Sequence, residues 1–181
     1  GGHLLYYWLT AGDAPQGGLP TNIKYRGVTM AAPARLHDTE HVRNIALVGH
    51  AGAGKTSLLE ALLARAGAIH QPGKVLSGNT VADASAQEKR IGHSLESAVC
   101  HLEHDGVFMH LVDTPGYPDF IGRAISVLPA VETAALVINA QAGVETVSRR
   151  IMRAAGERRL CRMIIVNRID SGDVDLAALM N

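Results

Sequence analysis

The sequence predicts an α/β fold in which a mostly parallel sheet carries one antiparallel hairpin strand and helices on both faces. Short apolar runs of strand length alternate with longer segments of helical periodicity. Polar and glycine-rich clusters directly follow several of these runs, where the carboxyl ends of parallel strands would hold a ligand. The 181 residues are enough for one domain, and no second domain is needed.

The expected elements lie between residues 44 and 171 and begin with an apolar strand that ends at a glycine. The expected strands are residues 45–48, 94–102, 107–112, 134–139 and 163–166, and the expected helices are residues 55–66 and 144–157. An Asp-Gly turn at Asp105 and Gly106 joins the second and third strands into a hairpin. Residues 67–92 are too long for an ordinary connection, so we expect a mobile functional loop there.

Residues 1–29 show no sustained periodicity and include a Gly/Pro-rich stretch, so we expect an appendage there, either an artificial or an upstream remnant. Met30 is a plausible natural start, which gives a domain over residues 30–181. This boundary assigns all the motifs described below to one domain.

Composition limits the classes of partner. Lys plus Arg and Asp plus Glu are both 17, so overall charge gives no attraction to nucleic acid or to membranes. No apolar run reaches the roughly 18 residues that span a bilayer. The two cysteines, Cys100 and Cys161, lie in apolar stretches, which is typical of small buried side chains in a reducing compartment. We therefore expect a cytoplasmic monomer without a membrane partner and without sequence-specific nucleic-acid contacts.

A phosphate-binding loop lies between the first strand and the first helix. It consists of Gly49, His50, Ala51, Gly52, Ala53, Gly54, Lys55 and Thr56, and Ser57 follows it. The glycines let successive amides point at phosphate oxygens, and the helix N-terminus adds its positive dipole end. Lys55 would neutralise the terminal phosphates, and the Thr56 hydroxyl would bind Mg²⁺. This motif predicts a P-loop nucleoside-triphosphatase fold.

A second motif, Asp113, Thr114, Pro115 and Gly116, ends the strand at residues 107–112. If this strand neighbours the first one, its carboxylate lies beside the phosphate loop and can hold a metal-bound water. Gly116 can offer its amide to the γ-phosphate, because a residue without Cβ allows close approach of the backbone. We expect these residues to contact the nucleotide.

A third motif, Asn167, Arg168, Ile169 and Asp170, ends the last predicted strand. The Asp170 carboxylate can accept hydrogen bonds from two donors of guanine that adenine lacks. Such bonds are worth about 1.5 to 3 kcal/mol each, so adenine would bind at least about tenfold more weakly. The three motifs together predict GTP and GDP as ligands, and Asp170 disfavours an ATP-dependent P-loop enzyme.

The order and spacing of these motifs resemble the G domain of translational GTPases, in particular elongation factor G and its paralogues, over Asn44 to about Ser171. The resemblance implies GTP hydrolysis, a bound Mg²⁺ and the ribosome as partner. It implies that residues 67–94 are the first switch, with Ser94 at the position of a threonine that completes the Mg²⁺ shell. It also implies that the domain is incomplete after Asn181, before its last base-contacting loop, strand and helix.

The sequence departs from that family at four positions. Tyr117 stands where these factors carry the histidine that positions the attacking water, and losing such a group commonly removes about 10² to 10⁴ in rate. We therefore expect slow hydrolysis, with Tyr117, Gly116 and Lys55 as the catalytic candidates; the alternative is a nucleotide-binding regulatory paralogue with little or no hydrolysis. Arg168 for lysine is expected to be tolerated. Ser94 for threonine, which keeps the hydroxyl, and Gly52 for aspartate resemble variant rather than standard elongation factors.

Arginines are concentrated on the last predicted helix and just after it. They are Arg149, Arg150, Arg153, Arg158, Arg159 and Arg162. They could form a local RNA-facing surface, but no aromatic residues are interleaved with them for base stacking. We interpret them as the solvated face of a helix whose opposite face is buried.

Overall fold

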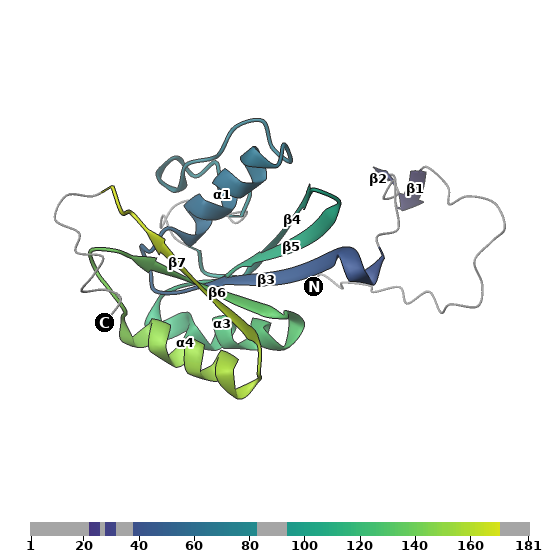
Figure 1. Cartoon of the computed structure of the whole chain (residues 1–181). Helices are drawn as coiled ribbons and strands as arrows, with labels where there is room; N and C mark the ends of the chain where they lie inside the picture. The colour runs from purple at the N-terminus through teal and green to yellow at the C-terminus, as the bar shows by residue number, and fades with distance from the viewer. Residues whose placement is uncertain (1–21, 26–27, 32–37, 83–93, 171–181) are drawn as a thin grey trace. The chain divides into compact units, whose positions relative to one another are not determined.

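The computed structural model describes residues 22–25, 28–31, 38–82 and 94–170 of the chain (Figure 1). The chain divides into two compact units, residues 1–37 and 38–181. Within the described ranges, no helix is both long and apolar enough to span a lipid bilayer.

The first unit contains an antiparallel hairpin of β1 (Asn22–Tyr25) and β2 (Val28–Ala31). This hairpin is not expected from the sequence, because each strand has only four residues, too few for an alternating pattern to stand out. β2 crosses the predicted boundary between residues 29 and 30.

The second unit is built on a five-stranded sheet with the order β4-β5-β3-β6-β7. The strands are β3 (Val42–Val48), β4 (Ala98–His104), β5 (Val107–Asp113), β6 (Thr133–Asn139) and β7 (Cys161–Asn167). β5, β3, β6 and β7 are parallel, and β4 pairs antiparallel with β5. The predicted α/β fold with one antiparallel hairpin strand is confirmed.

Helices cover both faces of this sheet, as expected (Figure 1). The helix α1 (Lys55–Arg65) lies on one face, and α3 (Ile121–Val127) and α4 (Thr146–Glu157) lie on the other. Four 3₁₀ turns join the elements of this described region: η1 (Thr39–His41), η2 (Val75–Ser77), η3 (Pro118–Phe120) and η4 (Leu128–Ala130). The seven-residue α3 was not expected, because fewer than three helical turns show little periodicity.

Strand alternation divides the core into two layers. Ala46 and Val48 of β3 pack toward α3 and α4, whereas Leu47 packs toward Leu59 and Leu63 of α1. The side chains of Leu59 and Leu63 are at most 2% exposed, and burying a leucine contributes about 2 kcal/mol. The packing of α1 fixes the helix N-terminus at the carboxyl end of β3.

The strand β4 begins at Ala98, not at Ser94 as predicted. Ala98 pairs with Asp113, the last residue of β5, so residues 94–97 have no strand opposite them. The carbonyl of Leu95 instead accepts a 2.5 Å hydrogen bond from the side chain of Arg123. Residues 94–97 therefore form a loop that carries Ser94 next to the carboxyl ends of β3 and β5.

Candidate functional site

The loop after β3 turns the chain directly into α1. Gly54 is the N-cap of α1 and has a left-handed backbone with φ of 91°. A Cβ at this position would collide with the side-chain amide of Asn167. Glycine is therefore needed here both for its backbone conformation and for the close approach of Asn167.

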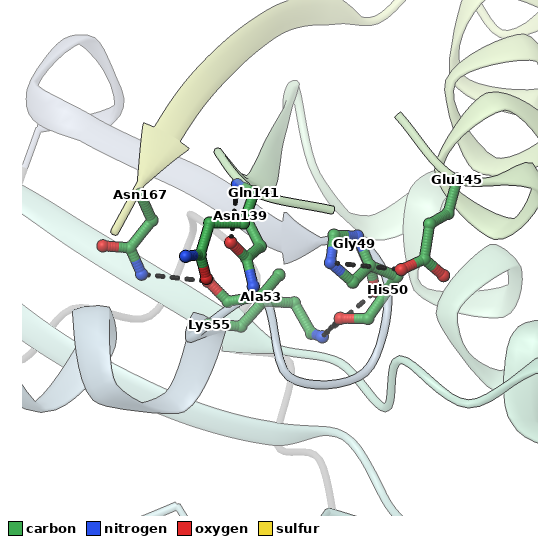
Figure 2. A network of polar contacts seen from close by, with 8 residues as sticks. All are labelled: Gly49, His50, Ala53, Lys55, Asn139, Gln141, Glu145 and Asn167. Atoms are coloured by element: carbon green, nitrogen blue, oxygen red, sulfur yellow. Dashed lines mark hydrogen bonds and ion pairs between the residues drawn. The ribbon is translucent and has the colours of Figure 1, made fainter. Parts of the chain in front are cut away.

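Lys55 begins α1 and lies inside the curled loop. Its side chain is 6% exposed, and Nζ donates hydrogen bonds to the carbonyls of Gly49 at 3.0 Å and His50 at 2.9 Å (Figure 2). Burial lowers the pKa of the Lys55 ammonium, and the nearby Asp113 carboxylate opposes this shift. The loop is thus wrapped around a buried amino group.

Three oxygen-bearing side chains meet beside Lys55. The Thr56 hydroxyl donates a 2.6 Å hydrogen bond to Oδ2 of Asp113, and the Ser94 Oγ lies 3.5 Å from the Thr56 Oγ1. These residues come from α1, from the end of β5 and from the loop before β4. The three residues predicted to serve a metal ion are therefore brought together.

The segment after β5 packs tightly on the phosphate loop. Thr114 is buried and its hydroxyl donates to the carbonyl of Leu47 at 2.7 Å, which ties the segment to β3. A Cβ on Gly116 would lie 2.5 Å from Nζ of Lys55 and 2.6 Å from the backbone nitrogen of Ala51. Tyr117 follows with 38% of its surface exposed. The backbone of Gly116 can lie this close to the phosphate loop only because glycine has no Cβ.

The motif after β7 reaches the phosphate loop through Asn167. Its Nδ2 donates a 2.9 Å hydrogen bond to the carbonyl of Ala53 (Figure 2), and its Oδ1 accepts one from the amide of Arg168. Arg168 has a left-handed backbone with φ of 58°, which is uncommon for a residue with a side chain. Asp170 is exposed two residues farther on. Asn167 thus braces the loop, a role that sequence spacing does not reveal.

On its other side the loop contacts the start of α4 through His50. The His50 side chain is 2% exposed, and its Nε2 lies 3.5 Å from Oε1 of Glu145, the N-cap residue of α4 (Figure 2). Burial lowers the pKa of His50 and outweighs Glu145, which raises it, while Lys55 and Arg168 lower it further. His50 is therefore a neutral spacer between the loop and α4 at neutral pH.

These elements enclose a pocket of about 610 Å³. The predicted residues that line it are Ala51, Gly52, Gly54, Lys55, Thr56, Ser57, Ser94, Thr114, Gly116, Tyr117 and Arg168. The predicted residues outside its lining are Gly49, His50, Ala53, Asp113, Pro115, Asn167 and Asp170. Of the latter group, Gly49, Ala53, Asp113 and Asn167 hold lining residues or the loop in place through contacts already described.

Three further lining residues were not predicted: Gly73, Lys74 and Val75. They lie at the start of η2 and just before it, and the amide of Gly73 is hydrogen-bonded to Glu60 of α1. The length of the connection at residues 67–92 indicated a functional loop, but no motif within it identified individual residues. Residues 83–93, including Gly92, which falls on the glycine of the expected switch motif, lie outside the described part of the chain.

A phosphate loop after β3, an aspartate after β5 and a polar motif after β7, all at one edge of a mainly parallel sheet, define a P-loop nucleotide-binding domain. The family model described as the elongation factor Tu GTP binding domain matches residues 40–181. The chain belongs to this family of translational GTP-binding domains.

Similar proteins carry the names of elongation factor G-like and tetracycline resistance proteins. An "Elongation factor G-like protein" of Mycobacterium tuberculosis is 40% identical over 129 residues, which cover 71% of this chain and 18% of that protein. The "Tetracycline resistance protein TetW" of Butyrivibrio fibrisolvens is 35% identical over 137 residues, covering 76% of this chain and 21% of that protein. The chain thus spans about a fifth of the length of these relatives.

A solved structure of a protein from Thermus thermophilus matches this fold with a TM-score of 0.74 and 38% identity. The match covers 77% of this chain and 21% of that protein. The fold of about three quarters of this chain is therefore shared with a solved structure.

Proposed function

We propose that this domain binds GTP and GDP in the pocket formed by the phosphate loop. The observation that carries the proposal is the charge of the pocket wall. Among the described residues that line it, Lys55, Lys74 and Arg168 are cationic and none is acidic. Such a wall favours a polyanion, and the N-terminus of α1 adds backbone amides and the positive end of the helix dipole.

Mg²⁺ is the metal that these residues fit. Thr56, Asp113 and Ser94 offer a hydroxyl, a carboxylate and a second hydroxyl, and Mg²⁺ prefers oxygen ligands and keeps waters and phosphate oxygens around it. Thr56 would bind the ion directly, Asp113 through a water, and Ser94 would complete its shell. Bound Mg²⁺ would neutralise negative charge on the phosphates.

Guanine is the base that we propose for this pocket. Arg168 lines it and can stack its guanidinium on a purine plane. Asn167 is hydrogen-bonded both to the Arg168 amide and to the phosphate loop, so it connects the two. The exposed Asp170 would accept hydrogen bonds from the donors on guanine. This assignment rests on residue chemistry and on family membership.

We further propose that the domain hydrolyses GTP slowly as part of a translation factor that acts on the ribosome in the cytoplasm. Relatives with printed names such as "Elongation factor G-like protein" and "Peptide chain release factor 3" support this context. Gly116 lies close to Lys55, where its amide would donate a hydrogen bond to the γ-phosphate of GTP. Tyr117 lines the same pocket. Tyr117 in place of a histidine favours slow turnover, and a regulator with little or no hydrolysis is the second candidate for the same reason.

Competition between nucleotides tests the binding proposal. Fluorescently labelled GDP is bound to the 181-residue chain with Mg²⁺, then displaced by unlabelled GDP, GTP or ADP. We expect GDP and GTP to displace it at least about tenfold better than ADP, since two charged hydrogen bonds to guanine would be lost with adenine. Equal displacement by ADP would exclude guanine selectivity, and no binding of labelled GDP would exclude the proposal.

A further inference from the structure

A buried carboxylate on α1 holds the turn that closes one side of the pocket. Glu60 is 1% exposed, and its Oε2 accepts a 2.7 Å hydrogen bond from the amide of Gly73. Its Oε1 accepts a 2.5 Å hydrogen bond from the amide of Val81. An unpaired carboxylate would be costly at such a site, and these amides satisfy it. Both ends of residues 73–81 are therefore tied to one side chain.

The turn between these two anchors is closed by its own hydrogen bonds. Oδ1 of Asn79 accepts a 2.7 Å bond from the amide of Lys74, and the carbonyl of Lys74 accepts one from Ser77. A Cβ on Gly73 would lie 2.6 Å from the carbonyl oxygen of Asn79, so only glycine fits at the first anchor. Lys74 directly follows Gly73, which is hydrogen-bonded to Glu60, and its own amide is hydrogen-bonded to Asn79. These two hydrogen bonds fix the backbone position of Lys74.

Lys74 lines the pocket together with Lys55 and Arg168. In the part of the chain that the structure describes, no carboxylate forms a salt bridge with Lys74. Lys55 lies deep in the loop, whereas Lys74 is exposed and comes from a different element. Lys74 is therefore an exposed cationic residue of the pocket lining without a salt bridge to a described carboxylate.

We propose that Lys74 is an additional phosphate-binding residue of this pocket and that Glu60 is its positioning residue. The inference rests on the proposed binding of guanine nucleotides and adds two residues that the motifs do not contain. A charge-assisted contact from a partly exposed ammonium strengthens binding modestly, so we expect about a five- to tenfold contribution to nucleotide affinity. The contribution grows with the negative charge of the nucleotide and shrinks as salt is added.

The direct test compares GTP and GDP affinities of Lys74→Ala and Lys74→Arg with those of the parent chain. Arg65→Ala is the matched control, because it also removes one exposed cation from the α1 region but does not line the pocket. We expect Lys74→Ala to weaken GTP binding about five- to tenfold at low salt, Lys74→Arg to stay within about twofold, and Arg65→Ala to do the same. Equal losses in Lys74→Ala and Arg65→Ala, or no loss in Lys74→Ala, would overturn the inference.

A double-mutant cycle separates positioning from general stabilisation. Glu60→Gln keeps the size of the side chain but places an amide donor against one backbone N–H, so one anchor is lost. If Glu60 acts through Lys74, Glu60→Gln weakens GTP binding, and adding Lys74→Ala causes little further loss. If the two losses of GTP affinity multiply in the double variant, Glu60 does not act through Lys74. A parent chain that binds no guanine nucleotide would instead refute the proposed function itself.

Discussion

The hydroxyl of Thr56 lies 2.6 Å from Oδ2 of Asp113 and donates a hydrogen bond to it, although the two residues are 57 positions apart in the sequence. The parallel pairing of β3 with β5 brings them together, since Leu47 pairs with Asp113 and α1 begins at Lys55, at the end of the loop that follows β3. A hydroxyl and a carboxylate at this separation can share one hydrated Mg²⁺. This pair therefore connects the sheet topology to the proposed metal site.

We expect Thr56→Ala to abolish the strengthening of GDP binding by Mg²⁺. The parent should bind GDP at least about tenfold more tightly with Mg²⁺ than with a chelator, a difference of about 1.4 kcal/mol. Thr56→Ala should bind equally in both conditions, and Thr56→Ser, which keeps the hydroxyl, should behave like the parent. Fluorescence titration measures all three chains. A Thr56→Ala chain with the full Mg²⁺ effect would show that this hydroxyl is not a ligand.

We expect Tyr117→His to accelerate ribosome-stimulated GTP hydrolysis at least about tenfold, or about 1.4 kcal/mol of barrier. An imidazole exchanges protons near neutral pH and can hold the attacking water through a compact ring nitrogen, whereas a phenol places its oxygen farther from the backbone. Single-turnover hydrolysis by this protein, with and without ribosomes, tests this expectation.

Tyr117→Phe is the matched control for that measurement, because it changes the same ring without supplying a proton-handling group, and it should show no gain. If the parent already turns over near roughly 1 s⁻¹ with ribosomes, within the ordinary range of enzymes, slow hydrolysis is refuted. The absence of any gain in Tyr117→His would show that this position does not limit the reaction.

We expect Asp170→Asn to shift base preference from guanine toward xanthine, because the amide can donate to the carbonyl that replaces the 2-amino group. The preference for GDP over xanthosine diphosphate should fall by at least about tenfold, corresponding to one charged hydrogen bond. Competition between the two diphosphates measures it. Asp105→Asn, in the exposed hairpin turn, is the control and should leave the preference as it is. The same preference in Asp170→Asn as in the parent would mean that Asp170 does not face the base.

The buried His50 predicts a loss of stability on mild acidification. Its pKa is lowered in the folded protein by burial, so as pH falls below about 6.5 the unfolded chain takes up a proton that the folded chain does not. Unfolding is therefore increasingly favoured as the pH falls through about 6.5 toward the lowered pKa of the folded chain. We expect His50→Gln to show a smaller fall in Tm over this range than the parent, with the exposed His104→Gln as control. An undiminished fall in His50→Gln would contradict this account.

The parts of the site that the sequence predicts are those encoded in short contiguous segments. The apolar run before Gly49, the phosphate loop and the leucine periodicity of α1 lie within about twenty residues, and each has its own local pattern. The carboxyl-end positions of Asp113 and Asn167 follow from the parallel sheet once the strands are recognised.

The unpredicted parts depend on contacts between distant residues. Asn167 donates a hydrogen bond to the carbonyl of Ala53 across 114 positions, and nothing in either segment specifies that the residues after β7 brace the loop after β3. Lys74 lines the pocket from a turn that is hydrogen-bonded to Glu60 of α1, and no motif in that turn indicates this contact. The late start of β4 likewise follows from where its partner strand ends, which the residues at 94–97 do not themselves indicate.

The most direct test of guanine-nucleotide binding at this loop is titration calorimetry of GDP into the parent chain and Lys55→Ala. Lys55 begins α1 with its ammonium enclosed by the loop, so its removal deletes the innermost cation of the pocket and the hydrogen bonds that curl the loop. We expect the parent to bind GDP and Lys55→Ala to bind at least about 100-fold more weakly, a loss of about 2.7 kcal/mol. Binding by Lys55→Ala within about threefold of the parent, under about 1 kcal/mol, would contradict the assignment of this loop as the phosphate site.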